Sequence, residues 1–348
     1  MSQAAAIALY SGGLDSILAC RLIMAQGIRV VAVKFVTPFF DDYLLGRAAE
    51  FQAEVLRKYG IDVRVHDLGE GYVQLLANPR HGYGKHFNPC IDCKILMLRT
   101  ARELLAEHGA SFLISGEVLG QRPMSQRRDT LRVIEKESGC ESILLRPLCA
   151  RHLPETTPEL EGLVRRSELC AFRGRGRLDQ IQLAARFGIT DYPAPAGGCM
   201  LTDPNLAGRI AGFYQDRERM NGAGLRVNDI RLLLVGRQFH LPGGHWLVLG
   251  RNEQENERIA ALAGAGDWLL TMTTRSGPTG LLRTPPGTGA GSGGDAALLA
   301  QAASMVVRYG RKIKGQPAAA EVLAVSGGEQ RTLAAQPLTD EACMGWQR

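Results

Sequence analysis

One turn constrains the fold of this chain more than any other stretch of its sequence. Residues 11–16 read Ser-Gly-Gly-Leu-Asp-Ser and lie between an apolar, strand-like run at residues 4–10 and a helix-like run at residues 17–24. In such a turn, backbone N–H groups point toward one place, and the helix dipole adds partial positive charge there. The turn therefore predicts an anion site at the end of the first strand of an α/β fold, where such folds bind ligands.

The residue types in the turn favour a nucleotide with a metal ion. Gly12 and Gly13 allow the main chain to approach a phosphate closely, and Ser11 and Ser16 offer hydroxyl donors. Asp15 would repel a phosphate unless a cation lies between them, so we interpret it as a partner of Mg²⁺, directly or through water. A plain strand–helix connection capped by Ser or Asp is the alternative. The turn lacks the Lys-Ser/Thr ending of a Walker A loop, which disfavours an ordinary NTPase.

Strand-like and helix-like runs alternate through the first half of the chain. Such alternation is typical of an α/β fold with a doubly wound parallel sheet. The expected strands after the first are residues 29–36, 62–68, 111–115 and 142–148, and the expected helices are residues 46–59, 88–108 and a run beginning near residue 129. Residues 69–86 are expected to form a loop that contains at most a turn of helix. Asn88 is expected to cap its helix, with Pro89 at the first helical position.

The second half has a different pattern. Short strands with Gly-Gly turns are expected at residues 231–235, 238–241 and 245–249, helices at 252–263 and 296–309, and a flexible loop at 284–295. We therefore predict three parts. They are a nucleotide-binding domain at 1–155, an arginine-rich helical segment at 156–215 that completes the active site, and a smaller α+β domain at 216–348.

Composition places the chain among globular proteins of the cytoplasm. It has 348 residues, a net charge of +6 and a sequence pI near 8.9, a balance compatible with a polyanionic partner. No run of about eighteen apolar residues is present, so we expect neither a membrane span nor a signal peptide. Eight cysteines without a secretory signal favour reduced thiols and metal ligands over disulfides.

Three cysteines form the second candidate site. Cys90 and Cys93 lie three residues apart on one helix face, where the helix N-terminus and Lys94 are expected to lower the pKa of their thiols. A redox dithiol, half a zinc site and two unremarkable cysteines all remain open for this pair. Cys199 follows two glycines on backbone that can bend sharply. Three thiolates suit an iron–sulfur cluster with one open iron, whereas structural zinc normally takes four ligands. The remaining cysteines are expected to pack in the core: Cys20, Cys140, Cys149, Cys170 and Cys343.

Arginines separated by glycine form the densest basic run of the chain. Arg173, Arg175 and Arg177 suit phosphate contacts, with Phe172 beside them for stacking. A solvated charged surface is the alternative. A second basic candidate, Arg251, lies in a Gly-Arg-Asn turn between an expected strand and an expected helix.

These motifs, in this order, resemble a known enzyme family. The turn at residues 11–16 resembles the loop of the PP-loop ATP pyrophosphatases, which cleave ATP to AMP and pyrophosphate. Over roughly residues 4–213, the ordered set of motifs resembles tRNA uridine thiolases. Besides the turn, the motifs are Cys90 and Cys93, then Gly116, Glu117, Gly120, Gln121, Ser125 and Gln126, and finally Cys199. The similarity is greatest to the iron–sulfur-dependent thiolases. Separately, residues 225–325 are similar to the RNA-binding domain of NFACT-type ribosome quality-control proteins.

The resemblance implies a function and a set of roles. A uridine carbonyl oxygen would attack the α-phosphate of ATP, and sulfur would then replace the adenylated oxygen, with 4-thiouridine favoured over 2-thiouridine. The implied ATP contacts are Ser11, Gly12, Gly13, Asp15, Ser16, Gly116, Glu117 and Gln121. Cys90, Cys93 and Cys199 would hold a [4Fe–4S] cluster, Asp15 would hold Mg²⁺, and sulfide or a sulfur-donor protein would supply the sulfur. A competing assignment makes Cys199 a persulfide carrier and one of the CxxC pair a nucleophile, as in cluster-free schemes. Arg173, Arg175, Arg177 and Arg251 would bind tRNA.

Two other functions stay open at this stage. One is a PP-loop ligase or amidase that acts on a small molecule and carries a zinc site. The other is a non-catalytic RNA-binding protein whose loop senses nucleotide. The sequence shows no THUMP-type RNA-binding segment ahead of the first strand, so we expect the C-terminal domain to bind tRNA; the oligomeric state is left open.

Overall fold

The computed structural model describes residues 4–195, 199–219, 226–285, 293–339, 341 and 346. The chain divides into two compact units, Met1–Gly208 and Arg209–Arg348, and each has a sheet of its own. The division falls close to the predicted start of the C-terminal domain, and the arginine-rich segment belongs with the first unit. Within the described part of the chain, no helix has both the length and the apolar character that a membrane span requires.

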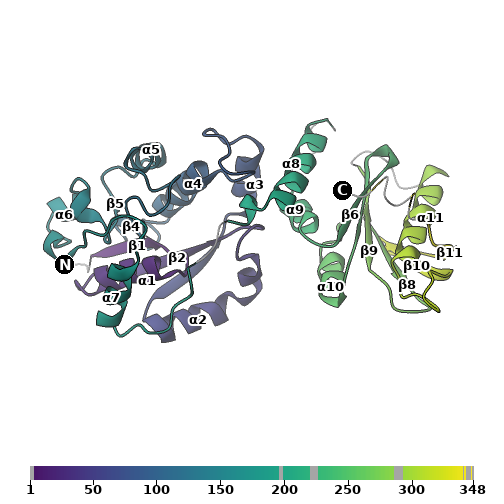
Figure 1. Cartoon of the computed structure of the whole chain (residues 1–348), viewed down its shortest axis with the longest axis horizontal. Coiled ribbons are helices and arrows are strands. Elements are labelled where there is room, and N and C mark those ends of the chain that lie inside the picture. Colours follow the sequence, from purple (N-terminus) through teal and green to yellow (C-terminus); the bar gives the residue numbers. More distant parts are fainter. Residues whose placement is uncertain are drawn as a thin grey trace. The chain divides into compact units, whose positions relative to one another are not determined.

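The first unit contains a parallel sheet with helices on both faces (Figure 1). Its strand order is β3-β2-β1-β4-β5, so the predicted doubly wound α/β fold is confirmed. Its main elements are β1 (Ala5–Leu9), α1 (Leu14–Met24), β2 (Arg29–Val36), α2 (Ala48–Tyr59), β3 (Asp62–Asp67), α3 (Gly69–Ala77), α4 (Cys90–Glu103), β4 (Phe112–Ser115), α5 (Arg128–Ser138), β5 (Leu144–Leu145), α6 (Thr157–Leu160) and α7 (Leu178–Arg186). Helix α8 (Pro204–Arg219) runs across the division between the units.

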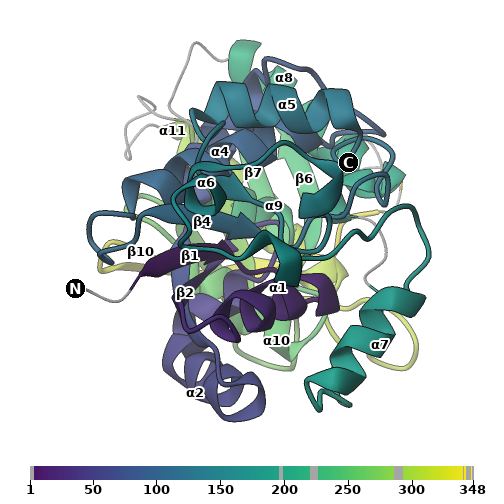
Figure 2. The ribbon, with the colours of Figure 1, turned by 90° about the vertical axis from the view of Figure 1, so that its left-hand side faces the viewer.

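Alternation along the buried strands creates a separate apolar core on each face of the sheet. In β1, Ala6 and Ala8 face the core formed with α1, α2 and α7, whereas Ile7 and Leu9 face the core formed with α4 and α5. Figures 1 and 2 show these two sets of helices on opposite sides of the sheet. Because successive side chains of a strand point to opposite faces, strands buried on both faces are apolar throughout.

Three local expectations for this unit are corrected. The helix at Cys90 is capped by Pro89 rather than Asn88, because Pro89 has non-helical angles of φ −88° and ψ 59°. The expected loop after residue 69 begins with helix α3, whose Tyr72, Val73 and Leu76 pack inward. The expected strand at residues 142–148 reduces to the two residues of β5.

The second unit is an α+β fold built on a sheet of order β11-β10-β8-β9-β7-β6, in which the paired strands run antiparallel. Its elements are α9 (Val227–Leu233), β6 (Arg237–Leu241), β7 (His245–Leu249), α10 (Glu253–Ala261), β8 (Trp268–Met272), β9 (Gly280–Arg283), α11 (Gly293–Arg308), β10 (Ala320–Ser326) and β11 (Glu329–Ala335). The expected strand at residues 231–235 is wrong, since most of that run lies in α9. A short apolar run does not distinguish a strand from a buried helix.

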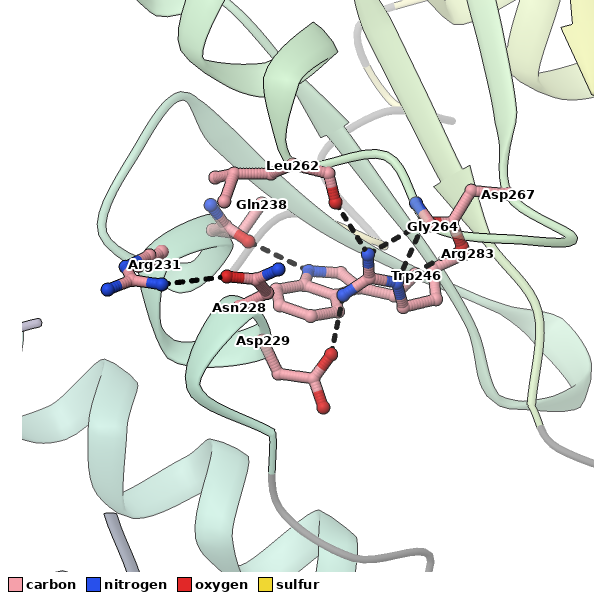
Figure 3. A network of polar contacts seen from close by, with 9 residues as sticks. All are labelled: Asn228, Asp229, Arg231, Gln238, Trp246, Leu262, Gly264, Asp267 and Arg283. Carbon is pink, nitrogen blue, oxygen red and sulfur yellow. Dashed lines mark hydrogen bonds and ion pairs between the residues drawn. The ribbon is translucent and has the colours of Figure 1, made fainter. Parts of the chain in front are cut away.

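Arg283 ties α9 to the sheet of this unit (Figure 3). Its Nη1 lies 2.5 Å from Oδ1 of Asp229 in α9, and its Nη2 lies 2.6 Å from Oδ2 of Asp267 just before β8. Nearby, Trp246 Nε1 donates a hydrogen bond of 2.7 Å to Oε1 of Gln238. A guanidinium held by two carboxylates at fixed angles fixes the position of α9 against β9.

Candidate functional site

The turn at residues 11–16 has the geometry of an anion cradle. Gly12 adopts φ +85°, a left-handed conformation that glycine reaches without strain. Ser16 Oγ donates to the carbonyl oxygen of Gly13 at 2.8 Å, and Ser11 Oγ donates to Ser16 Oγ at 3.2 Å. Helix α1 begins after Gly13, and no side chain caps its N-terminus. The Ser16 N–H donates to the Gly13 carbonyl oxygen at 3.0 Å, so the N–H groups of the two residues before it, at the start of α1, are the ones that face an anion.

Asp15 is held by an amide chain that reaches from α7. Gln121 Nε2 donates a hydrogen bond of 2.7 Å to Asp15 Oδ2, and Gln180 Nε2 donates one of 3.3 Å to Gln121 Oε1. The second carboxylate oxygen, Asp15 Oδ1, is buried and has no hydrogen-bond partner in the described part of the chain. A buried, unpartnered carboxylate oxygen beside an anion cradle fits the predicted cation site, because Mg²⁺ takes oxygen ligands.

Gly116 brings a second loop against this turn. It follows β4, the neighbour of β1 at the point where the strand order reverses. A Cβ on Gly116 would lie 2.6 Å from the carbonyl carbon and oxygen of Asp15 and from the backbone nitrogen of Ser16. Only glycine permits this contact, which places residues 116–121 beside the turn at the expected ligand crevice of the sheet.

A cavity of about 560 Å³ opens over the turn. Besides Asp15 and Gln121, its lining includes the basic side chains of Lys34, Lys58, Arg122 and Arg177. Neither lysine was expected from the sequence, although a lysine inside the apolar run 29–36 was a visible signal. Lys34 Nζ donates to the Ser11 carbonyl oxygen at 2.8 Å and lies 2.5 Å from Oδ2 of Asp41. It therefore fixes the turn and adds positive charge to its base.

Glu117, which the sequence assigns to nucleotide contact, lies in a buried ion network in the structure. Its Oε2 accepts from Arg146 Nε at 2.9 Å and from Ser115 Oγ at 3.0 Å, and its other oxygen lies 3.9 Å from Lys94 Nζ. Burial alone would raise the pKa of Glu117, but the charges of Arg146 and Lys94 hold the pKa below its usual 4.5. The network anchors the loop that carries Gly116 and Gln121 to the core.

Cys90, Cys93 and Cys199 lie in one neighbourhood. The Cys90 thiol raises the pKa of Cys93 and of Cys199 electrostatically, and Cys199 also raises the pKa of Cys93. The backbone supports this convergence, since the Phe87 N–H donates to the Leu201 carbonyl oxygen at 3.2 Å. Tyr72 of α3, which was not expected from the sequence, hydrogen-bonds the Cys93 thiol. Residues 196–198, the glycine turn ahead of Cys199, lie outside the described residues.

The expected lowering of the thiol pKa values is wrong. Burial raises the pKa of Cys93 to about 12 and also raises that of Cys90 and Cys199. Lys94 lowers the pKa of the paired thiols as expected, but desolvation outweighs it. The cysteines expected in the core differ in burial: Cys20, Cys140 and Cys149 are buried, Cys170 is half-buried, and Cys343 lies outside the described residues.

Cysteine thiolates are the donor type that iron–sulfur clusters take. Across the described ranges, no three His, Cys, Asp or Glu side chains are arranged to hold one metal ion. A cluster with several irons bonds each thiolate to a different iron, so its ligands need only surround it. Three converging cysteines therefore fit such a group on donor chemistry.

Arg122 connects the cavity with the cysteines. It lines the cavity over the turn at residues 11–16, and its charge also lowers the pKa of Cys90 and of Cys199. The charge of Arg122 therefore acts both on the cavity over the turn at residues 11–16 and on the cysteines.

The basic residues expected to bind RNA have different environments. Arg173 pairs by its backbone with Leu119, and Arg173 and Arg175 are exposed. Arg177 lines the cavity instead, and its Nε is buried with no hydrogen-bond partner in the described chain. In the second unit, Arg251 is ion-paired with Glu255, their Nη2 and Oε1 atoms lying 2.5 Å apart.

Comparison with known proteins places two family domains on this chain. Residues 1–153 match the thiamine biosynthesis protein (ThiI) family model, and residues 236–347 match the NFACT protein RNA binding domain. The two matches fall in the first and second unit, respectively.

Curated relatives match part of the chain. A probable tRNA sulfurtransferase of Methanothermobacter thermautotrophicus is 32% identical over 223 residues, which is 63% of this chain and 50% of that protein. One of Lysinibacillus sphaericus is 28% identical over 147 residues, 42% of this chain and 35% of that protein. The chain thus spans half or less of the length of these relatives. A solved 4-thiouridine synthetase–RNA complex with bound ATP is 22% identical, with a TM-score of 0.38, over 66% of this chain and 52% of that one.

Proposed function

We propose that this chain, which carries a ThiI-type domain at residues 1–153 and an NFACT-type RNA-binding domain at residues 236–347, is an ATP-dependent tRNA uridine thiolase. The observation that carries the proposal is the position of Arg122, which lines the nucleotide cavity and acts on two of three converging cysteines. The reaction requires the base activated by ATP and the incoming sulfur to be adjacent. The nucleotide cavity and the cysteines, both within reach of Arg122, meet this requirement.

The nucleotide part of the reaction follows from the cavity. The turn at residues 11–16 and the N-terminus of α1 would bind the pyrophosphate portion of ATP, and Asp15 would hold the Mg²⁺ that offsets the phosphate charge. The uridine carbonyl oxygen attacks the α-phosphorus and pyrophosphate leaves. Arg122 and Arg177 stabilise the negative charge that builds up on the phosphates.

The sulfur part uses the cysteines. Cys90, Cys93 and Cys199 hold a [4Fe–4S] cluster, which when bound supplies an iron without a protein ligand, where sulfide can bind. Tyr72 orients Cys93 through its hydrogen bond. Sulfide attacks the ring carbon that carries the adenylated oxygen, and AMP leaves with that oxygen. We favour O4 of uridine, giving 4-thiouridine, over O2. The target base must leave its stack to reach this site, at a cost of a few kcal/mol.

Residues of both units bind the tRNA. The exposed Arg173 and Arg175 lie beside the loop of residues 116–121, next to the nucleotide cavity, and suit contacts to phosphates near the target base. The NFACT-type domain supplies further contact to tRNA. The proposed site is assembled within the first unit, and the proposed location is the cytoplasm.

A reconstituted reaction tests the proposal. The chain, purified anaerobically and supplied with ATP, Mg²⁺, sulfide and tRNA, should form thiouridine, AMP and pyrophosphate in equal amounts. Cys199→Ser should abolish thiouridine and lower bound iron, while Cys170→Ser, which changes a half-buried thiol away from the three, should retain both. Release of AMP and pyrophosphate without any thiouridine in the unaltered chain would contradict it.

A further inference from the structure

The second unit contains a basic hollow outside the site described above. It has a volume of about 800 Å³ and lies between the segment after β8, the segment after α11 and strands β10 and β11. Its lining includes Arg275, Arg311 and Lys312, with Glu321 as its acidic member. A concave surface lined mainly by cations attracts polyanions.

The loop after α11, residues 311–316, is rigid at its tip. Ile313 and Gln316 exchange backbone hydrogen bonds of 2.9 and 3.0 Å across a two-residue turn. The turn holds Lys314 at φ +48° and Gly315 at φ +80°, the left-handed angles of a tight hairpin turn. The tip therefore presents Lys312, Ile313 and Lys314 in a fixed arrangement, and Ile313 is 50% exposed.

Arg275 clamps this loop to the body of the unit. Its Nε donates to the Arg311 carbonyl oxygen at 2.9 Å and its Nη1 to that of Ala319 at 2.9 Å, while its Nη2 donates to the carbonyl oxygen of Ala318. The Arg311 N–H in turn donates to the Ser276 carbonyl oxygen at 3.0 Å. The guanidinium reaches three carbonyls from three different nitrogens in a fixed planar fork, whereas a lysine donates from a single nitrogen.

The cations on this loop are available to a partner. Arg311, Lys312 and Lys314 are exposed, and among the described residues their side chains have no carboxylate partner. Arg251 and Arg331, elsewhere in this unit, are paired with Glu255 and Glu329. Because the backbone of the loop is already fixed by its turn, binding phosphate costs it little backbone conformational entropy.

We propose that the 311–316 loop is the main phosphate-binding surface of the second unit and that its partner is the sugar–phosphate backbone of a folded RNA. The inference rests on the proposed RNA-binding function and goes beyond it by naming the contact residues. Arg311, Lys312 and Lys314 contact phosphates, and Ile313 contacts a ribose or base face between them. Arg275 is a positioning residue that keeps the loop in place.

Binding of a tRNA transcript to the full chain without ATP, measured across a salt series, tests this inference. The triple variant Arg311→Gln, Lys312→Gln, Lys314→Gly keeps the turn, because glycine accepts the left-handed angles. The logarithm of the binding constant falls linearly with the logarithm of the salt concentration, and each phosphate contact adds about 0.9 to the steepness of that fall. Loss of three contacts should therefore make the slope shallower by about 2 to 3 and lower the affinity by about tenfold or more. Arg275→Lys keeps the charge but loses the clamp, so affinity should fall several-fold while the slope stays unchanged.

A charge-matched variant separates this surface from net charge. Arg226→Gln, Arg258→Gln, Arg331→Gln removes three cations elsewhere in the unit and should change affinity less than threefold. Equal losses in the two triple variants, or binding by the loop variant within twofold of the parent, would overturn the assignment and leave the thiolase proposal intact. A parent chain that binds an acidic protein but no RNA would overturn both this inference and the RNA part of the proposed function.

Discussion

Gln121 Nε2 lies 2.7 Å from Asp15 Oδ2, although 106 positions separate the two residues in the chain. The contact joins the loop after β4 to the first turn of α1. Among the described residues it leaves Asp15 Oδ1 buried without a hydrogen-bond partner, directed by the amide rather than free to rotate. Gln121 is therefore a positioning residue for the carboxylate that we assign to Mg²⁺.

Replacement of Gln121 by Leu should raise the Mg²⁺ concentration needed for half-maximal ATP binding. Loss of a partner that orients a metal ligand typically costs about 10- to 100-fold in metal affinity. Titration of Mn²⁺ into the ATP-bound chain, followed by its paramagnetic signal, measures this directly. Gln180→Leu, one step further from the carboxylate, should show a smaller shift in the same direction, and equal Mn²⁺ affinity in all three proteins would exclude the positioning role.

Gly116→Ala should disrupt the nucleotide site and destabilise the first unit. The added Cβ would lie 2.6 Å from backbone atoms of Asp15 and Ser16, which cannot move aside like a flexible side chain. Overpacking of this kind costs about 1 to 3 kcal/mol. Thermal denaturation with and without ATP measures both effects. Gly208→Ala, where an added Cβ meets nothing within 4 Å, is the matched control and should unfold at the parent temperature or slightly above.

Glu117→Gln should destabilise the chain at neutral pH by about 3 kcal/mol, because it leaves the buried Arg146 with an incomplete set of charged partners. The pKa of Glu117 in the folded chain lies below its usual 4.5, so its contribution is present above that value and is lost as the pH falls through the folded pKa. The difference in unfolding free energy between parent and variant should therefore be constant from pH 7 to about pH 5 and shrink below it. Urea denaturation at several pH values measures the difference, and a gap that widened toward acid would contradict the assignment.

Arg177 is expected to act on ATP, and Arg173 and Arg175 are expected to act on tRNA. Arg177 lines the nucleotide cavity, so Arg177→Ala should raise the ATP concentration required for pyrophosphate release by about tenfold, the loss of one charged contact. Arg173→Ala with Arg175→Ala should leave ATP binding unchanged and lower the salt slope of tRNA binding by about 1 to 2. Salt-dependent tRNA binding and ATP titration, made on the same proteins, check both statements. An unchanged salt slope in the double variant would remove its assignment to RNA.

Much of the first unit could be predicted from its sequence. Residues 29–36 form β2 with the expected bounds, and the turn at residues 11–16 follows β1 as expected. Buried parallel strands and their glycine-rich turns give strong local signals. The hairpin of β10 and β11 was missed, because its exposed strand β11 carries polar residues such as Glu329, Gln330 and Arg331 and little apolar alternation.

The site was predicted less completely than the fold. The separate motifs were visible, but Lys34 and Tyr72 lie in runs that local pattern assigns to the core or to a loop. Their roles depend on contacts across the sheet and between helices, which periodicity does not reveal. The pKa values of the Cys90, Cys93 and Cys199 thiols differ from expectation for the same reason, since burial is a property of the packed chain.

Whether this chain thiolates tRNA is answered by mass spectrometry of tRNA nucleosides from cells with and without it. We expect one thiolated uridine, 4-thiouridine in the favoured case, to disappear when the chain is absent. It should return with the parent chain and stay absent with Asp15→Asn or Cys199→Ser. An unchanged set of thiolated uridines in cells lacking the chain would contradict the proposed function.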